Sequence, residues 1–256
     1  MHEYNYVKLK ESRWESEILS FVAKIHEYTG KQELYLRQKP VELERLIEVA
    51  KIQSTESSNK IEGIETTSAR VRQLVQEKTT PISRDEQEIA GYRDVLKRIH
   101  ASHEHIPLTQ NVILQLHRDL LAYTDKSFGG AFKNTQNYIS EASDDGSAAA
   151  RFIPLQPYKT PQAVDEICKH YEQALAQEVI NPLILIPVFI CDFLCIHPFN
   201  DGNGRMSRLL STLLLYKSGY MVGRYISIEK KIEKTKDTYY DVLKQVSDTW
   251  YEEEQD

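Results

Sequence analysis

The sequence predicts a mainly α-helical protein with one small β-hairpin. Most of its 256 residues place apolar side chains three or four positions apart, the spacing of a helix with one buried face. Residues 128–157 differ, because two short extended pieces flank an acidic, glycine-containing loop there. No repeat and no long linker interrupts the pattern, so we expect one helical core.

The helices before the hairpin are expected in the following order. The first runs from about Glu11 to Tyr28 with Gly30 as its stop, and the second runs from Pro40 toward the segment STESSNKIEGIETT. Ser83 and Thr109 are the expected N-caps of the third and fourth. The apolar stripes of the first two helices consist of Trp14, Ile18, Phe21, Val22 and Ile25, and of Leu43, Leu46, Ile47 and Ala50.

Four helices are expected after the hairpin. One opens near Pro161, the next runs from Pro182 to His197, another ends at Gly219, and the last is an amphipathic helix in IEKTKDTYYDVLKQVSDTWYEEE. The apolar run PLILIPVFICDFLCI is shorter than the roughly 20 residues of a bilayer span, so it predicts a buried helix.

Composition narrows the class of protein. The net charge of -6 disfavours nucleic acid as a partner, and the N-terminus has no apolar signal-peptide region, so we expect a cytoplasmic protein without a membrane anchor. Three cysteines do not make a disulfide framework, and Cys191 and Cys195 are expected in the core. The segment HASHEH, with His100, His103 and His105, is expected at a solvated helix end.

The segment CIHPFNDGNGRMSRLL, residues 195–210, gathers groups that suit phosphate chemistry. A Gly-Asn-Gly turn that opens a helix presents backbone N–H groups to an anion, and two arginines three positions apart share one helix face. A carboxylate can hold Mg²⁺ on a phosphate, and a histidine can take a proton from a hydroxyl. The pattern alone also fits a common glycine turn, a structural histidine and two solvated arginines.

The same segment, read as HPFNDGNGRMSR, resembles the Fic motif HPFx(D/E)GNGRxxR at every defined position. The order of elements over residues 85–245 is also similar to a Fic domain. The resemblance implies the Fic fold, a helical bundle with a small β-hairpin flap over the active site. It divides the chain into an N-terminal region (1–82), a catalytic core (83–223) with the flap at 128–157, and a C-terminal helical segment (224–256).

Fic enzymes transfer a nucleoside monophosphate, usually AMP from ATP, to a Ser, Thr or Tyr hydroxyl of a protein. The resemblance implies that His197 is the general base, that Asp201 holds Mg²⁺, and that Phe199 fixes the loop. The complete motif argues against the kinase-like branch of the wider family. The implied phosphate- and nucleotide-binding residues are Phe199, Gly202, Asn203, Gly204, Arg205 and Arg208.

The flap is expected to dock the target as an added strand. The residues expected to do so are Phe132, Lys133, Tyr138 and Ile139. Lys133 stands where Fic proteins frequently have an arginine, and Ser140 where they commonly have a glycine. These two differences put the target specificity in doubt.

An N-terminal segment, SSNKIEG, resembles the inhibitory motif (S/T)xxxE(G/N) of autoinhibited Fic proteins. Ser58, Glu62 and Gly63 occupy its defined positions. The resemblance implies that Glu62 pairs with Arg208 where the γ-phosphate of ATP should bind. A serine and a glutamate four positions apart are otherwise commonplace on helices.

Several functions stay open at this level. The prediction is an autoinhibited protein adenylyltransferase that acts on a protein target and on itself. The alternatives are removal of AMP from a modified protein, transfer from another donor, and a nucleotide-binding regulatory module without turnover; a DNA-binding regulator has less support. An exposed helix face or strand edge could support a homodimer.

Overall fold

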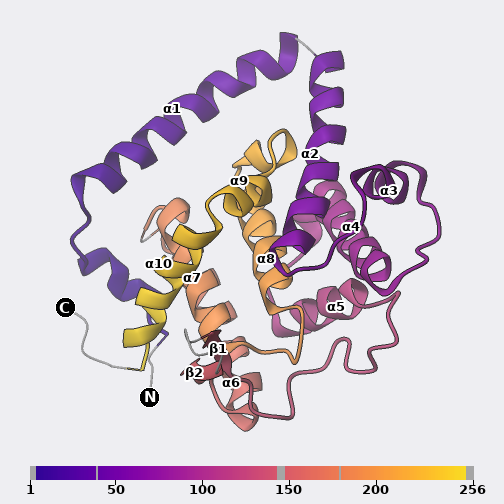
Figure 1. Cartoon of the computed structure of the whole chain (residues 1–256). Coiled ribbons are helices and arrows are strands. Elements are labelled where there is room, and N and C mark those ends of the chain that lie inside the picture. Colours follow the sequence, from indigo (N-terminus) through magenta and orange to yellow (C-terminus); the bar gives the residue numbers. More distant parts are fainter. Residues whose placement is uncertain (1–3, 39, 143–147, 179, 252–256) are drawn as a thin grey trace.

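The computed structural model describes residues 4–38, 40–142, 148–178 and 180–251. Its helices surround α7 (Pro182–Ile196) and α8 (Asn203–Lys217), which lie in the middle of the bundle (Figure 1). Helix α7 is apolar on nearly every side, and Leu185, Phe189 and Phe193 are fully buried. A helix of this kind is stable only when neighbours cover it on all sides, so α7 becomes the centre of the core.

Three more helices contribute buried side chains to this core: α4 (Arg84–Ser102), α5 (Gln110–Leu120) and α6 (Thr160–Ala176). The expected N-caps are confirmed, because the Ser83 and Thr109 side chains accept hydrogen bonds from the backbone of the first turn of α4 and α5. Gly91 lets these two helices approach, since a Cβ there would lie 1.9 Å from the carbonyl oxygen of Leu120.

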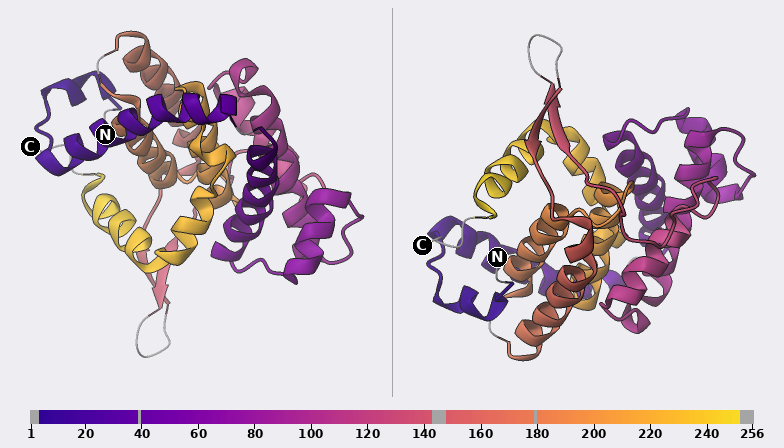
Figure 2. Two further views of the ribbon diagram at one scale, coloured as in Figure 1. Left: turned by 90° about the horizontal axis from the view of Figure 1, so that it is seen from above. Right: turned by 90° about the horizontal axis from the view of Figure 1, so that it is seen from below.

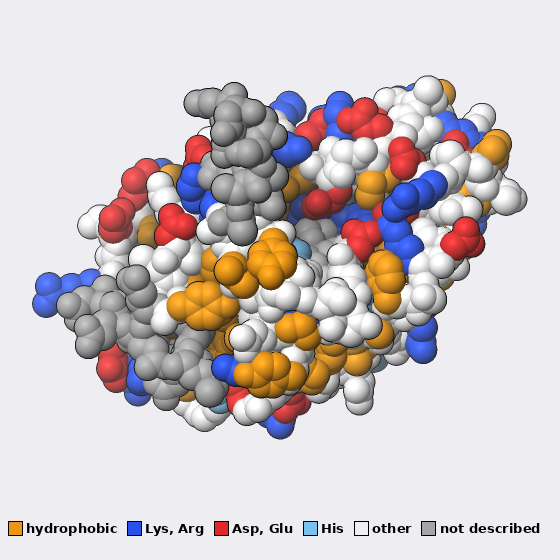
Figure 3. Space-filling model, turned by 60° about the horizontal axis from the view of Figure 1, so that its bottom comes forward, with side chains coloured by type: hydrophobic (Ala, Val, Ile, Leu, Met, Phe, Trp, Pro, Cys, Tyr) orange, Lys and Arg blue, Asp and Glu red, His pale blue; other side chains and the backbone are white. Residues whose placement is uncertain are grey.

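The β-hairpin consists of β1 (Ile139–Ala142) and β2 (Ala148–Phe152), which pair antiparallel with an irregularity after Ile139. It projects from the helical body (Figure 2). The acidic loop predicted at its tip falls largely on residues 143–147, outside the described part. Apolar side chains gather around the foot of the hairpin (Figure 3).

The N-terminal helices differ from the prediction. Helix α1 (Ser16–Gln38) continues through Gly30, so the expected stop there is wrong. Nothing lies within 4 Å of a Cβ at Gly30, and the Glu27–Lys31 pair bridges this turn. The expected stripe does not face the core, because α1 arches over the bundle (Figure 1) and leaves Phe21 53% exposed.

Helix α2 (Pro40–Ile61) packs on α4 and on α9 (Ile228–Lys234). It is followed by α3 (Ser68–Arg72) and a π-helical turn, Gln73–Glu77. The predicted last helix, which starts at Ile232, is interrupted at Thr235: residues 232–234 end α9, and α10 (Lys236–Thr249) forms the rest.

Two side-chain predictions have different outcomes. His100 is buried rather than solvated, because its ring packs edge-on against Tyr216 with centroids 5.4 Å apart. Cys195 is buried as expected, and Cys191 is half-buried. None of the described helices is long and apolar enough to cross a membrane.

Asp192 connects both ends of the chain to α7. Its carboxylate accepts a hydrogen bond from the Tyr6 hydroxyl at 2.7 Å and one from the Trp250 indole at 2.8 Å. All three residues are buried. A carboxylate in an apolar helix is costly unless it is hydrogen-bonded, so these contacts explain how the core tolerates it.

Candidate functional site

The loop between α7 and α8 carries most of the predicted site. It begins at His197, whose backbone is left-handed (φ 50°), and ends at Gly202 (φ 83°), after which α8 starts. The Asn203 side chain accepts a hydrogen bond from Phe199 N at 2.9 Å and donates one to Phe199 O at 2.7 Å. This double contact fixes the loop, so Asn203 has a role in holding the turn that sequence reasoning did not assign.

The ring of Phe199 is fully buried and stacks on the imidazole of His117, with centroids 3.7 Å apart. His117 Nδ1 accepts a hydrogen bond from Gly130 N, so its other nitrogen carries the proton and donates to Asp201 O at 3.0 Å. Burial lowers the pKa of His117 to about 4, which keeps the ring neutral. Sequence reasoning missed His117, since one histidine on the apolar face of a helix gives no signal of a role.

His197 is held in one tautomer as well. Its Nδ1 lies 3.3 Å from the carbonyl oxygen of Leu194, which can only accept, so Nδ1 bears the proton. Burial, together with the nearby Lys133 ammonium, lowers the pKa of His197 to about 4. The imidazole is therefore neutral at neutral pH, and its Nε2 has a lone pair that can accept a proton.

Asp201 belongs to a network of charges. Lys126 contacts both Asp201 and the buried Glu88, and Arg205 lies 2.7 Å from Glu88 and 3.5 Å from Asp201. Burial alone would raise the pKa of Asp201, but the Lys126 hydrogen bond and the Arg205 charge hold it below the usual value. Asp201 is thus a carboxylate at neutral pH, with its side chain 40% exposed.

Arg205 is the more enclosed of the two predicted phosphate-binding arginines, at 1% exposure against 3% for Arg208. Its Nη2 faces Glu88, and its Nε and Nη1 have no hydrogen-bond partner among the described residues. Sequence reasoning missed Glu88 and Lys126, because each lies more than seventy residues from the motif. Two donors of Arg205 therefore remain for an oxygen-rich ligand.

Arg208 bonds through two of its three guanidinium nitrogens to Ser58 on α2 and to Glu62 just after this helix. Its Nε donates to Ser58 Oγ at 2.8 Å, and its Nη2 donates to Ser58 O at 2.9 Å and to Glu62 Oε1 at 2.7 Å. Ser58 is fully buried and Arg208 is 3% exposed. Two segments about 150 residues apart in the sequence thus meet through a charge-assisted cluster.

Glu62 also covers the first turn of α8. A Cβ at Gly204 would lie 2.1 Å from Glu62 Oε1, so only glycine permits this approach. Gly63 has a left-handed backbone (φ 74°) and follows the end of α2. The structure therefore brings Ser58 and Glu62, two of the three defined residues of the predicted motif, to Arg208, and Gly63 follows directly. It also places the Glu62 carboxylate at the N-terminus of α8, where negative charge is favourable.

The predicted docking residues of the flap have unequal exposure. Lys133 is 3% exposed and donates to the carbonyl oxygen of Ile196 at 2.9 Å, and burial lowers its pKa to about 8. Phe132 stacks on Phe199, and Ile139 packs against the core. Tyr138, at 60% exposure, is the one of the four that projects into solvent.

The geometry defines a mainly helical protein in which a glycine turn, fixed by Asn203, joins two central helices beside a neutral histidine. Comparison with known proteins agrees, because residues 107–215 match the Fic/DOC family. These residues form a Fic domain.

Relatives and solved structures carry the same domain. The protein adenylyltransferase Fic of Drosophila grimshawi is 29% identical over 164 residues, which cover 62% of this chain and 32% of that protein. The chain thus spans about a third of the length of this curated relative. A Fic domain-containing signalling protein of Bacteroides thetaiotaomicron is 25% identical with a TM-score of 0.72, covering 86% of this chain and 81% of that one. A Fic family protein of Desulfovibrio desulfuricans has a TM-score of 0.75 at 22% identity, covering 93% and 69%.

Proposed function

We propose that this chain is a protein adenylyltransferase restrained by its own Glu62. It would transfer AMP from ATP to a Ser, Thr or Tyr hydroxyl of a target protein, and of itself when the restraint is removed. The contact between Glu62 and Arg208, lying over the first turn of α8, is the observation that carries the proposal. Residues 1–82 would act as the regulatory region and the Fic domain as the catalytic part.

In the reaction, His197 Nε2 accepts the proton of the target hydroxyl, whose oxygen attacks the α-phosphorus. The bond to the β,γ-diphosphate breaks, and pyrophosphate leaves with the bonding electrons. Support comes from the fixed tautomer and low pKa of His197, which present a proton acceptor at neutral pH. The backbone N–H groups of Asn203 and Gly204 and two donors of Arg205 would stabilise the phosphate charge, while the Gly202 N–H donates to Asp201 Oδ1 at 2.6 Å.

The chemistry of Asp201 fits a magnesium site. Mg²⁺ bound to a nucleotide takes one or two carboxylates and completes its coordination with phosphate oxygens and water. Asp201 is charged and partly exposed at the edge of the glycine turn, so it would hold the ion. When bound, the ion would neutralise part of the polyphosphate charge.

The restraint acts through position and charge. Arg208 would bind the γ-phosphate, but Ser58 and Glu62 already take its Nε and Nη2 donors. Glu62 also repels a phosphate at the N-terminus of α8. ATP that avoids this carboxylate binds with its α-phosphate displaced from His197, and a displacement of about 1 Å can slow a reaction by roughly a hundredfold.

The test is transfer of label from α-phosphate-labelled ATP with Mg²⁺ to protein. Glu62→Gly should label itself strongly, wild type weakly, and the double variant Glu62→Gly/His197→Ala not at all. Glu65→Gly is the matched control, because Glu65 lies three residues further on and shares no contact with Arg208. Equal labelling of wild type and Glu62→Gly would refute the restraint. Absence of label in every variant, with other labelled nucleotides included, would favour a binding module without turnover.

A further inference from the structure

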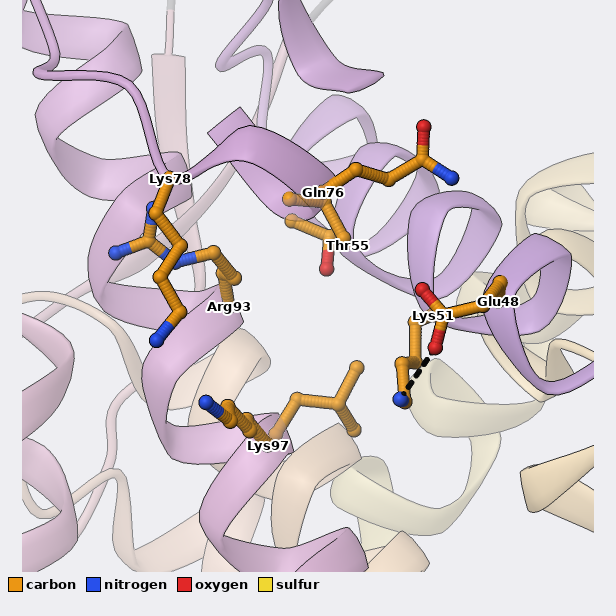
Figure 4. Close-up of a pocket in the computed structure, with 9 residues that line it drawn as sticks. Glu48, Lys51, Thr55, Gln76, Lys78, Arg93 and Lys97 are labelled. Atoms are coloured by element: carbon orange, nitrogen blue, oxygen red, sulfur yellow. Dashed lines mark hydrogen bonds and ion pairs between the residues drawn. The ribbon is translucent and has the colours of Figure 1, made fainter. Parts of the chain in front are cut away.

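A partly open cavity lies beside α2, the helix that carries Ser58 and ends just before Glu62. It has a volume of about 250 Å³ and is lined by α2, the π-helical turn Gln73–Glu77 and α4. Figure 4 shows cationic side chains extending around it from α4 and from the end of the π-helical turn. Its lining includes Lys51, Thr55, Val75, Lys78, Leu96 and Lys97.

The charges around this cavity are unbalanced. Lys51 pairs with Glu48 at 2.7 Å, and Arg93 pairs with Asp94 at 2.8 Å. Lys78 and Lys97 form no ion pair with a carboxylate in the described part of the chain, and their ammonium groups point to the same side of the cavity (Figure 4). The nearby Lys78 side chain lowers the pKa of Lys97; both lysines are exposed, and the Asp94 carboxylate offsets part of their charge. Two cations held this close favour an anion between them.

The backbone supports the same interpretation. Lys78 has a left-handed conformation (φ 51°), which is uncommon for a residue with a side chain, and it closes the π-helical turn. Isolated π-helical turns occur frequently at functional sites. This geometry fixes where the Lys78 side chain leaves the backbone.

Polar and apolar groups on the other walls complete a site for an organic anion. The Thr55 hydroxyl belongs to a residue that is 1% exposed, and it makes no hydrogen bond within the described residues. Val75 and Leu96 add an apolar surface. This oxygen has almost no exposed surface, so a ligand oxygen would bond to it only after the Thr55 side chain rotates toward the cavity.

We propose that this cavity binds a small phosphorylated organic molecule, whose phosphate lies between Lys78 and Lys97 and whose body contacts Thr55, Val75 and Leu96. The ligand connects α2 to α4. Thr55 precedes Ser58 by one helical turn, so an occupied cavity stabilises α2 in the position that holds Glu62 on Arg208. This regulatory consequence rests on the proposed function, whereas the binding site does not.

The binding experiment is calorimetric titration of the whole chain with ribose 5-phosphate, inorganic phosphate and ribose. We expect a Kd near or below about 1 mM for the ester, weaker binding of inorganic phosphate and no binding of ribose. Lys78→Gln/Lys97→Gln should weaken the ester at least tenfold. The control Lys24→Gln/Lys169→Gln removes the same charge from exposed positions elsewhere and should leave the affinity unchanged.

Two results would overturn the site. One is no binding of the ester by wild type; the other is an equal loss of affinity in both double variants, which would indicate non-specific attraction. Equal affinity for the ester and inorganic phosphate would overturn the role of Val75 and Leu96.

The link to α2 is tested by hydrogen exchange, which does not depend on activity. The ester should slow exchange of the amides in residues 52–61 in wild type and not in Lys78→Gln/Lys97→Gln. Unchanged exchange despite binding would refute the link. In the transfer assay, the ester should lower labelling of Ser58→Ala several-fold. If the ester binds and slows exchange but no variant is labelled, the proposed function is refuted and this site is not. If Glu62→Gly is labelled but the ester does not bind, this site is refuted and the proposed function is not.

Discussion

Removing the Ser58 hydroxyl should release the restraint without touching its carboxylate. In Ser58→Ala, Arg208 Nε loses its acceptor at 2.8 Å, while the Ser58 carbonyl and Glu62 still bind Nη2. Both side chains are buried, so water does not readily replace the lost acceptor. The substitution therefore weakens the docking of α2 on α8 rather than abolishing it.

The magnitude follows from this one hydrogen bond. A bond to a charged group contributes about 1.5–3 kcal/mol, and about 1.4 kcal/mol is a factor of ten in an equilibrium. The population with Glu62 displaced from Arg208 should rise between about 10- and 150-fold. The rate of self-labelling should rise by the same factor until it reaches the rate of Glu62→Gly.

The assay is the initial rate of label transfer from α-phosphate-labelled ATP, compared with Ser57→Ala. Ser57 is also buried on α2, but its hydroxyl donates to Glu233 at 2.7 Å rather than to Arg208. Ser57→Ala should raise the rate less than Ser58→Ala, because Glu233 is partly exposed and keeps Lys230 as a partner at 2.9 Å, whereas Arg208 Nε is left buried without its acceptor. An equal rise in the two variants would refute the reasoning, because general loosening of α2 would then explain the effect.

Three further predictions concern stability. Gly91→Ala should lower the free energy of unfolding in urea by about 3 kcal/mol, because its Cβ would meet the Leu120 carbonyl at 1.9 Å. Gly30→Ala on exposed α1 should raise it by about 0.5–1 kcal/mol, and equal effects of the two substitutions would contradict the close packing of α4 on α5. Asp192→Ala should cost about 3 kcal/mol or more, since two buried donors lose their acceptor, and the exposed Asp165→Ala should cost little; similar losses would count against the role of Asp192. Burial lowers the pKa of His100 to about 4, so the unfolded chain binds more protons between pH 6.5 and 4 and stability falls as the pH drops through that window. His100→Phe should reduce this slope in urea titrations; an unchanged slope would exclude His100 as its source.

Local signals in the sequence predicted a helix boundary correctly where the signal residue itself makes the contact that starts the helix. Ser83 and Thr109 begin α4 and α5 because their hydroxyls accept backbone N–H groups, a property that needs no other part of the chain. Gly30 did not end α1, because glycine permits a helix end without requiring one. The stripe of α1 could not be assigned to the core, since periodicity shows which residues share a face and not whether another element covers it.

In the candidate site, too, the residues predicted from local sequence differ from those that only tertiary packing places. The residues from His197 to Arg208 are contiguous, so their spacing alone predicted a loop between two helices with a glycine turn. Glu88 lies on α4, His117 on α5 and Lys126 in the segment after α5. They were missed because only tertiary packing brings them to Asp201 and Arg205. The exposure of the flap residues also depends on packing, as the burial of Lys133 against Ile196 illustrates.

The strength of the proposed restraint depends on the whole docking surface of α2. Glu62 stays over Gly204 only while the end of α2 stays on α8, and contacts outside the motif hold that end. Lys236 donates to the Ile61 carbonyl at 2.8 Å, and Ser57 bonds to Glu233, so α9 and α10 fix the last turn. Each contact adds to the free energy that must be overcome before Arg208 can meet a phosphate. A ligand, a partner or a modification that loosens any one of them would raise activity without entering the nucleotide site, and the effects of distant contacts should combine additively.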